Sequence, residues 1–268
     1  MKIYTVDAFV DPNKSFSGNP AAVMPVDDFP SDEMCQNIAK EMNLSETAFV
    51  KQLTLDHFHI RWFTPAVEVK LCGHATLATA HILYEEGLTH AARISFESKS
   101  GLLTVVKNQN EFTLDFPLQP TGQVLDKITF EKILNTEIIT ATQALDDVLI
   151  ELPSEMYLRN FKPNFEKIVN IDCRGLILTA RADEDSQYDF VSRFFGPRVG
   201  VPEDPVTGSA HCKLADYWHK KLGKTEFVAY QASPRGGEIK LAVEQNRVKL
   251  KGRALTVIQG KWLNDARL

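Results

Sequence analysis

The sequence lacks the features typical of nucleic-acid-binding, membrane-spanning and disulfide-rich proteins. Its 30 Lys and Arg are outnumbered by 35 Asp and Glu, the net charge is −5, and no basic run suggests a nucleic-acid partner. No apolar run reaches the roughly 20 residues that a membrane helix needs, and the first residues lack the apolar segment of a signal peptide. The four cysteines form no CxxC pair, which predicts neither a zinc site nor a disulfide framework. We therefore expect a cytoplasmic protein with reduced thiols that binds no membrane.

The composition is otherwise that of an ordinary globular protein. Of the 268 residues, 44% are hydrophobic and 24% are charged, which is enough for a substantial core. For a chain of this length, roughly two domains are expected. Pro117, Pro120 and Gly122 form the strongest linker signal in the chain. The sequence thus predicts two lobes, residues 1–116 and 117–268.

One stretch of the sequence occurs twice, as residues 61–75 and again as residues 193–211. The residues Arg, Phe, Pro, Val and Val recur at the same offsets, at positions 61, 63, 65, 67, 69 and at positions 193, 195, 197, 199, 201. Each copy then reaches a glycine, Gly73 or Gly208, that begins a helical pattern. The second copy is three residues longer before its glycine, and this longer loop contains Glu203-Asp204-Pro205. The repeat predicts two half-molecules that share one strand–loop–helix unit.

Hydrophobic periodicity and turn residues predict many strands and one dominant helix in each half. Strands are expected at residues 2–9, 21–25, 57–62, 93–97, 102–107, 111–116, 174–180, 189–195, 239–243, 247–250 and 254–259. Helices are expected at residues 31–43, 74–86, 127–135, 164–169 and 209–222. This pattern indicates an α+β fold of two similar lobes, each a curved mixed sheet around a central helix.

The glycine-led helix starts are the first functional signal. The first turn of a helix presents unpaired N–H groups and the positive end of the helix dipole, and it can bind a carboxylate or stabilise an enolate. Taken singly, each start is more often an ordinary helix cap. Because both copies begin in the same way at Gly73 and Gly208, we favour a functional role.

Other polar residues are ambiguous on spacing alone. Glu46 is most simply a solvated loop carboxylate, and His74 a first-turn histidine. Asp204 is compatible with a turn residue, and Ser209 with a helix-start hydroxyl. His57 and His59 share a strand face, but the sequence places no third ligand beside them, so no metal site is expected.

Five short motifs together resemble the phenazine-biosynthesis PhzF-like isomerases. They are Ser17-Gly18-Asn19-Pro20, Ser45-Glu46-Thr47-Ala48-Phe49, Phe63-Thr64-Pro65, Cys72-Gly73-His74-Ala75-Thr76 and Glu203-Asp204-Pro205-Val206-Thr207-Gly208-Ser209-Ala210. The resemblance runs nearly from end to end, and the last of these motifs is highly specific. It implies two pseudo-symmetric lobes of the kind found in diaminopimelate epimerase, and cofactor-free proton transfer in a homodimer.

The resemblance also implies roles for individual residues. Glu46 matches the acid/base of the family, whereas His74, Asp204 and Ser209 match residues that contact the substrate. We expect Glu46 to move the proton while His74 and Asp204 orient the substrate and share its charge. Further substrate-binding residues are expected in the same motifs: Asn19, Ser45, Gly73, Thr207 and Gly208.

A comparison of the two copies bears on whether the enzyme uses two bases or one. Two-base racemases of this fold place a cysteine before the helix-opening glycine of each lobe, whereas this chain has Cys72 in one copy and Thr207 in the other. A threonine hydroxyl is far too weak an acid to replace a thiol. A single carboxylate can still move a proton between two positions on one face of a small carboxylate-bearing substrate. Two alternatives remain open: a racemase or epimerase that uses Cys72 opposite Glu46, and a binding protein without turnover.

Overall fold

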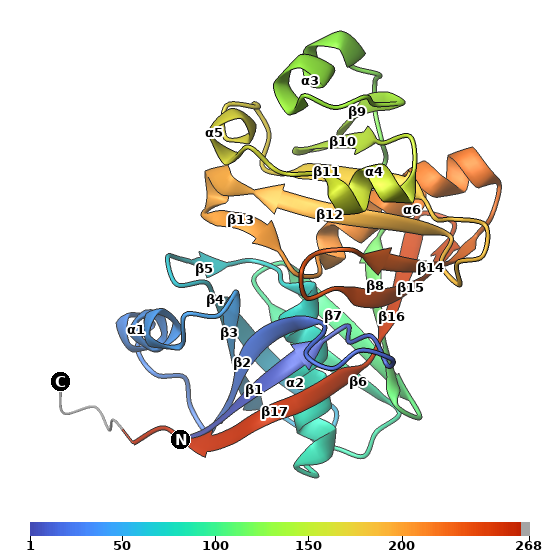
Figure 1. Ribbon diagram of the computed structural model, residues 1–268. Helices are drawn as coiled ribbons and strands as arrows, with labels where there is room; N and C mark the ends of the chain where they lie inside the picture. Colours follow the sequence, from blue (N-terminus) through green and yellow to red (C-terminus); the bar gives the residue numbers. More distant parts are fainter. Residues whose placement is uncertain (264–268) are drawn as a thin grey trace. The chain divides into compact units, whose positions relative to one another are not determined.

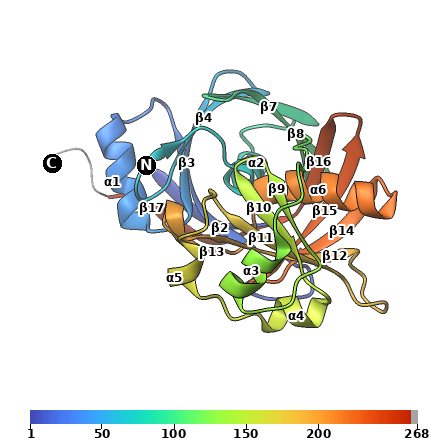
Figure 2. The same ribbon diagram turned by 90° about the horizontal axis from the view of Figure 1, so that it is seen from above.

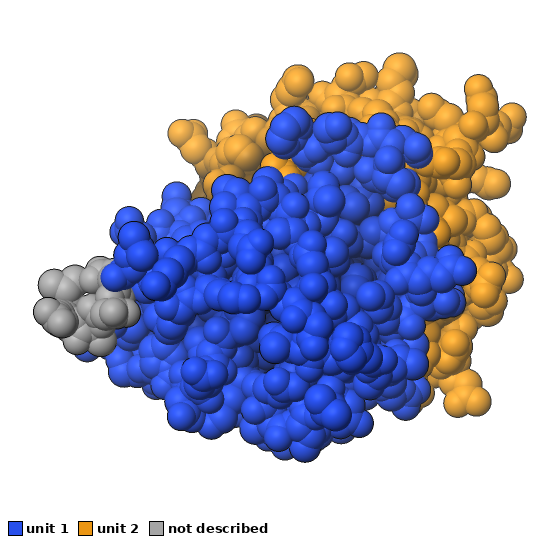
Figure 3. Space-filling model, turned by 90° about the horizontal axis from the view of Figure 1, so that it is seen from below, with its two compact units in different colours: residues 1–115, 251–268 blue, residues 116–250 orange. Residues whose placement is uncertain are grey.

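The structure is a computed structural model that describes residues 1–263. The chain forms two compact units, shown in Figure 3: unit 1 holds Met1–Asp115 and the described residues from Lys251 onward, and unit 2 holds Phe116–Leu250. Within the described residues, no helix is both long enough and apolar enough to cross a membrane.

Unit 1 is a mixed sheet with two helices (Figure 1). Its elements are β1 (Lys2–Ala8), β2 (Asn19–Val26), α1 (Asp32–Met42), β3 (Glu46–Gln52), β4 (His57–Phe63), β5 (Glu68–Val69), α2 (Gly73–Glu85), β6 (Arg93–Ser98), β7 (Gly101–Asn108), β8 (Glu111–Pro117) and β17 (Ala254–Lys261). Strand β1 pairs with β17 and β2, β2 runs parallel to β3, β3 is antiparallel to β4, and β4 runs parallel to β6.

Unit 2 repeats this arrangement. Its elements are α3 (Lys127–Leu134), β9 (Thr140–Ala144), β10 (Asp147–Glu151), α4 (Glu155–Asn160), α5 (Phe165–Ile168), β11 (Leu176–Arg181), β12 (Phe190–Gly196), a 3₁₀ turn (Pro197–Val199), β13 (Val201–Asp204), α6 (Gly208–Leu222), β14 (Glu226–Gln231), β15 (Gly237–Glu244) and β16 (Arg247–Gly252). Strand β10 runs parallel to β11, β11 is antiparallel to β12, and β12 runs parallel to β14. The succession of parallel and antiparallel pairs from β2 to β7 therefore recurs from β10 to β15.

One ion pair occurs at the same place in both units. The Arg61 guanidinium binds both carboxylate oxygens of Glu68, each at 2.9 Å, and lies 5.0 Å from the Phe63 ring centroid. In unit 2, Arg193 binds Glu203 at 2.7 and 2.9 Å and lies 5.0 Å from the centroid of Phe195. Each bidentate pair fixes the strand and the loop that leads to the central helix. The repeat found in the sequence is thus a repeat of three-dimensional structure, and the α+β prediction is confirmed.

The central helices are buried on most of their surfaces. Helix α2 packs against β1, β2, β3 and β17. Figure 1 shows α2 beside these strands, and Figure 2 gives the same structure from above. Small residues such as Ala75 and Ala78 let the sheet approach, and the buried hydroxyls of Thr76 and Thr79 donate to carbonyls one turn earlier. Helix α6 ends at the predicted glycine, since Gly223 has φ 65° and caps the helix through its N–H.

The C-terminal strand differs from the prediction. Residues 254–259 were predicted as a strand of the second lobe, 117–268, but β17 pairs along its length with β1 and belongs to unit 1. Sequence periodicity identifies a strand but not its partner, because pairing depends on residues far away in the chain. Strands β9 and β10 and helix α4 were not predicted, and they lie where apolar runs are short or interrupted.

His211 in the first turn of α6 gives a testable pH dependence of stability. Complete burial lowers the pKa of His211 to about 4, although its hydrogen bond to the Thr207 carbonyl acts in the opposite direction. Below its ordinary pKa of about 6.5, the unfolded chain binds a proton at this residue that the folded chain does not. Stability should therefore fall as the pH falls, and a shift of this size corresponds to about 3 kcal/mol.

The measurement is urea unfolding between pH 7 and pH 4, compared between the wild type and His211→Gln. Other groups titrate in the same range, so the contribution of His211 is the difference between the two pH profiles. His90→Gln at an exposed histidine is the matched control. Parallel profiles for the wild type and His211→Gln would contradict the prediction.

Candidate active site

The chemically active residues of unit 1 meet at the edge of the sheet where α2 begins. Asn19 and Glu46 are the first residues of the parallel strands β2 and β3, so both lie at the amino ends of these strands. Cys72 is the N-cap of α2, and His74 lies in its first turn. Strand direction and the helix start therefore bring together residues that are far apart in the sequence.

His74 is the centre of this cluster. Its Nε2 lies 3.1 Å from Glu46 Oε2, and its Nδ1 lies 3.3 Å from Asn19 Nδ2 and 3.5 Å from Cys72 Sγ. The Ser45 hydroxyl donates to Asn19 Oδ1 at 3.2 Å. The side chains of His74 and Glu46 are only 7% and 16% exposed, so water screens their interaction weakly. Five of the predicted site residues (Asn19, Ser45, Glu46, Gly73 and His74) are thus placed together.

Burial has opposite consequences for His74 and Cys72. Burial alone lowers the pKa of His74, but the interactions with Cys72 and Glu46 outweigh it, and the net pKa lies well above 6.5. Burial, together with the nearby charge of Glu46, raises the pKa of the Cys72 thiol to about 11. At neutral pH Cys72 therefore stays a thiol, and the nearby Glu46 carboxylate favours a proton on the ring nitrogen of His74 that faces it. A thiol is a poor base, so the geometry favours Glu46 as the base of this cluster.

Unit 2 contains a second cluster, built around Asp204 and Thr207. The Thr207 hydroxyl donates to Asp204 Oδ2 at 2.5 Å. Gln231, at the end of β14, donates through Nε2 to the Asp204 carbonyl at 2.8 Å and to Thr207 Oγ1 at 3.1 Å. Its Oε1 accepts from the Thr207 N–H at 2.8 Å. The sequence analysis missed Gln231, because nothing in the local pattern separates a buried glutamine from an exposed one.

Ser209 follows Gly208 in the first turn of α6, as predicted. Its hydroxyl accepts from Arg174 Nη2 at 3.4 Å, and Asp147 holds the same nitrogen at 2.6 Å. Asp147 is fully buried and is also paired with the buried Lys213. Arg174 is a second residue that sequence reasoning missed, since its partners are distant in the chain.

The internal repeat shows which groups unit 2 lacks. Phe63 and Phe195 are equivalent residues of the repeat. Phe63 pairs with Thr47 in β3, and Phe195 pairs with Leu176 in β11. The residue before each partner is also equivalent, so Gly175 takes the position that Glu46 has in unit 1. A Cβ at Gly175 would lie 2.2 Å from Phe194 Cζ, so the phenylalanine ring fills the space of a side chain. The equivalent of Cys72 is Thr207. Both potential bases of unit 1 are therefore replaced by other residues in the repeat.

The structure corrects the argument against a metal site. The sequence placed no three-ligand set, yet ligand atoms of Glu46, Cys72 and His74 lie within 4.8 Å of one another. Sequence spacing relates Cys72 to His74, but it cannot show that β3 brings Glu46 to the same place. His57 instead contacts Glu97 at 3.1 Å.

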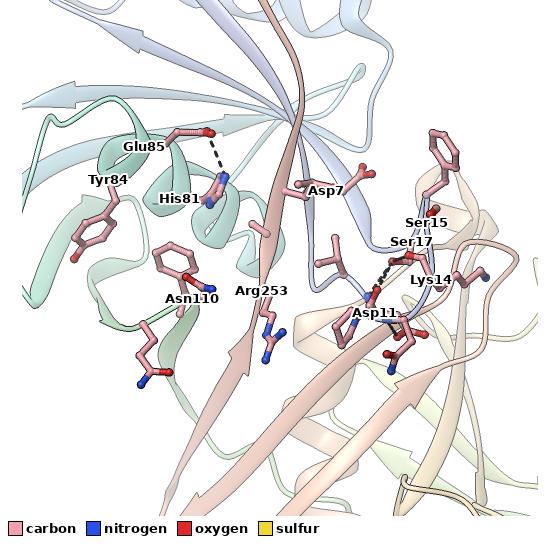
Figure 4. Close-up of a pocket in the computed structure, with 18 of the residues that line it drawn as sticks. Asp7, Asp11, Lys14, Ser15, Ser17, His81, Tyr84, Glu85, Asn110 and Arg253 are labelled. Atoms are coloured by element: carbon pink, nitrogen blue, oxygen red, sulfur yellow. Dashed lines mark hydrogen bonds and ion pairs between the residues drawn. The ribbon is translucent and has the colours of Figure 1, made fainter.

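The cavity of about 630 Å³ in Figure 4 lies elsewhere on unit 1. It is lined by the loop after β1, the last turns of α2 and the start of β17, with labelled side chains that include Asp11, His81 and Arg253. None of the predicted site residues lines it. This cavity is therefore separate from the polar cluster at the start of α2.

Comparisons with known proteins agree with the motifs. The phenazine biosynthesis-like (PhzC-PhzF) family matches residues 6–260. An uncharacterised isomerase of Halalkalibacterium halodurans is 47% identical over 263 residues, which cover 97% of this chain and 98% of the relative. A PhzF-family crystal structure from Enterococcus faecalis has a TM-score of 0.89 at 40% identity and covers 98% of this chain and 99% of its own.

A more distant structure supports the fold alone. A probable proline racemase of Agrobacterium radiobacter has a TM-score of 0.64 at 10% identity, and the match covers 99% of this chain and 94% of the racemase. The fold is therefore shared with racemases, whereas the motifs and the high identities are shared with PhzF-like proteins. On this evidence the chain belongs to the phenazine biosynthesis-like (PhzC-PhzF) family.

Proposed function

We propose that this protein is a cofactor-independent isomerase that moves a proton within a small carboxylate-bearing substrate, with Glu46 as the only base. The observation that carries the proposal is the asymmetry of the repeat. Glu46 stands beside His74 in unit 1, whereas Gly175 and Thr207 take the positions of Glu46 and Cys72 in unit 2. One base fits transfer on one face of a substrate better than it fits racemisation, which requires a base on each face.

In this mechanism the Glu46 carboxylate removes a proton from a carbon of the substrate and returns it to another position. His74 holds the Glu46 carboxylate in place through Nε2. The Asn19 amide and the Ser45 hydroxyl orient His74 in turn. We assign the N–H groups at Gly73, Gly208 and Ser209 to the substrate carboxylate, and Asp204, held by Thr207, to substrate orientation.

The direct test is hydrogen exchange with solvent. The purified protein is incubated in deuterated water with a panel of small unsaturated or hydroxylated carboxylates, with no added cofactor. NMR should show deuterium at the carbon that receives the proton, together with a shifted double bond. Inversion of a stereocentre without a shift would instead favour the racemase alternative based on Cys72.

We also propose that the protein acts as a cytoplasmic homodimer. The family resemblance suggests the dimer, and apolar side chains on β17 support it, since Leu255, Val257 and Ile258 are 58%, 46% and 59% exposed. Light scattering at micromolar concentration should give twice the mass of one chain. Val257→Lys should shift the distribution towards the monomer. A wild-type mass of one chain would count against the proposal.

A further inference from the structure

Three metal-ligating atoms of different kinds lie close together, on Glu46, Cys72 and His74. A thiol sulfur, an imidazole nitrogen and a carboxylate oxygen lie within 4.8 Å of one another, and the three side chains are largely buried. The two contacts of His74 use different ring nitrogens: Nε2 lies 3.1 Å from Glu46 Oε2, and Nδ1 lies 3.5 Å from Cys72 Sγ. One ion would use only one of these nitrogens, so the side chains must rotate to share it.

The donor set matches the preferences of zinc. Zn²⁺ binds cysteine sulfur, histidine nitrogen and carboxylate oxygen at about 2.0–2.3 Å in tetrahedral geometry, which places the ligand atoms about 3.3–3.7 Å apart. Three protein ligands with a fourth position open to water form a common arrangement. Cys72 and His74 are fixed by the first turn of α2, whereas the longer Glu46 side chain can adjust. Mg²⁺ and Ca²⁺ prefer all-oxygen sites, so the thiol and the imidazole disfavour them.

We propose that Glu46, Cys72 and His74 form a reversible Zn²⁺ site, and that bound Zn²⁺ inhibits the enzyme by occupying Glu46. On binding, Zn²⁺ displaces the thiol proton of Cys72, which passes to the buffer, whereas His74 binds through one unprotonated ring nitrogen and keeps its proton on the other. The inhibitory part of the proposal rests on the proposed function, whereas the binding part does not. The described residues of unit 2 offer no equivalent, since Thr207 and Gly175 replace Cys72 and Glu46, so we expect one ion per chain.

Cobalt is the probe for binding, because tetrahedral Co²⁺ bound to a thiolate gives a near-ultraviolet charge-transfer band and intense visible bands. Titration of the purified full-length protein with Co²⁺ should give these bands with saturation at one equivalent. Zn²⁺ should then displace Co²⁺ and remove them. A spectrum without a thiolate band, or saturation at two equivalents, would overturn the proposed site.

Three variants separate this site from other thiols and histidines. Cys72→Ala should lose the thiolate band, and its Zn²⁺ affinity should fall by at least about 10²-fold. Cys173→Ala is the matched control, because Cys173 is the one cysteine that is not buried, and it should keep the band. Glu46→Gln should keep the band with weaker binding, since the sulfur and the nitrogen remain. A band that survives Cys72→Ala but disappears with Cys173→Ala would refute the assignment.

Activity measurements distinguish failure of the site from failure of the proposed function. With a substrate in hand, Zn²⁺ should inhibit competitively, and a chelator should restore the rate. If the cobalt spectra support the site but Zn²⁺ leaves the rate unchanged, the inhibitory part of the proposal is wrong. Glu46 would then no longer be supported as the sole base, whereas the metal site itself would stand.

Discussion

Replacing Glu46 with glutamine should lower kcat/KM by about 10³-fold or more. Positioned general acid–base catalysis contributes roughly 10²–10⁴-fold, and a sole base should lie in the upper part of this range. Glutamine keeps the shape of the side chain and can still contact His74, but its amide cannot accept and return a proton. The loss should therefore appear in kcat, with a smaller change in KM, because the groups assigned to the substrate carboxylate are untouched.

Cys72→Ala is the comparison that separates the two mechanisms. Under proton transfer by Glu46 alone, this change should be mild, because the buried thiol holds its proton at neutral pH. Under two-base racemisation, it should be as severe as the change at Glu46. Deuterium uptake that survives Glu46→Gln but is lost with Cys72→Ala would overturn the isomerase proposal and favour the racemase. Thermal unfolding of both variants shows whether either substitution simply destabilises the fold.

The elements that a repeat or a strong local pattern marks could be predicted from the sequence. Gly73 and Gly208 were predicted to begin helices, and α2 and α6 begin there. The family motifs selected Glu46 and His74, whose contact at 3.1 Å joins two distant segments. Spacing alone would not have paired them, because the local sequence around a loop carboxylate or a first-turn histidine does not show which residue it contacts.

The features that could not be predicted from the sequence depend on contacts between residues far apart in the chain. Strand β17 belongs with β1 across more than two hundred residues, and no local pattern records that register. The three-donor cluster was missed for the same reason, since Glu46 lies near Cys72 because β3 packs against α2. Residues that act through buried hydrogen bonds can be identified only when the structure shows their partners.

Gln231 determines the direction of the hydrogen bonds that reach Asp204. Because its Oε1 accepts from the Thr207 N–H, its Nε2 must be the donor facing Thr207 Oγ1. The Thr207 hydroxyl accepts that bond, and its single proton is left for Asp204 Oδ2. Asp204 is thereby held as an acceptor in one orientation. Gln231 is fully buried, so no water can replace it when its amide is changed.

Gln231→Glu should therefore lower kcat/KM by about 10²-fold at neutral pH, comparable to the effect of a displacement of about 1 Å of a positioning group. Glutamate keeps the acceptor for the Thr207 N–H but replaces the amide donor with an oxygen. When that oxygen is protonated, the donor returns, so activity relative to the wild type should recover as the pH falls. Gln231→Leu removes all three hydrogen bonds and should show a loss that no pH restores.

The measurement is the pH profile of kcat/KM for the wild type and both variants, with Gln123→Leu at an exposed glutamine of unit 2 as the control. A purely structural role would lower stability in both Gln231 variants without a pH-dependent recovery in Gln231→Glu. Thr207→Val combined with Gln231→Glu provides a second check. Because Gln231 reaches the Asp204 carboxylate through the Thr207 hydroxyl, the double variant should lose little more activity than Thr207→Val alone. Additive losses would show that Gln231 acts instead through its bond to the Asp204 carbonyl, contrary to this prediction.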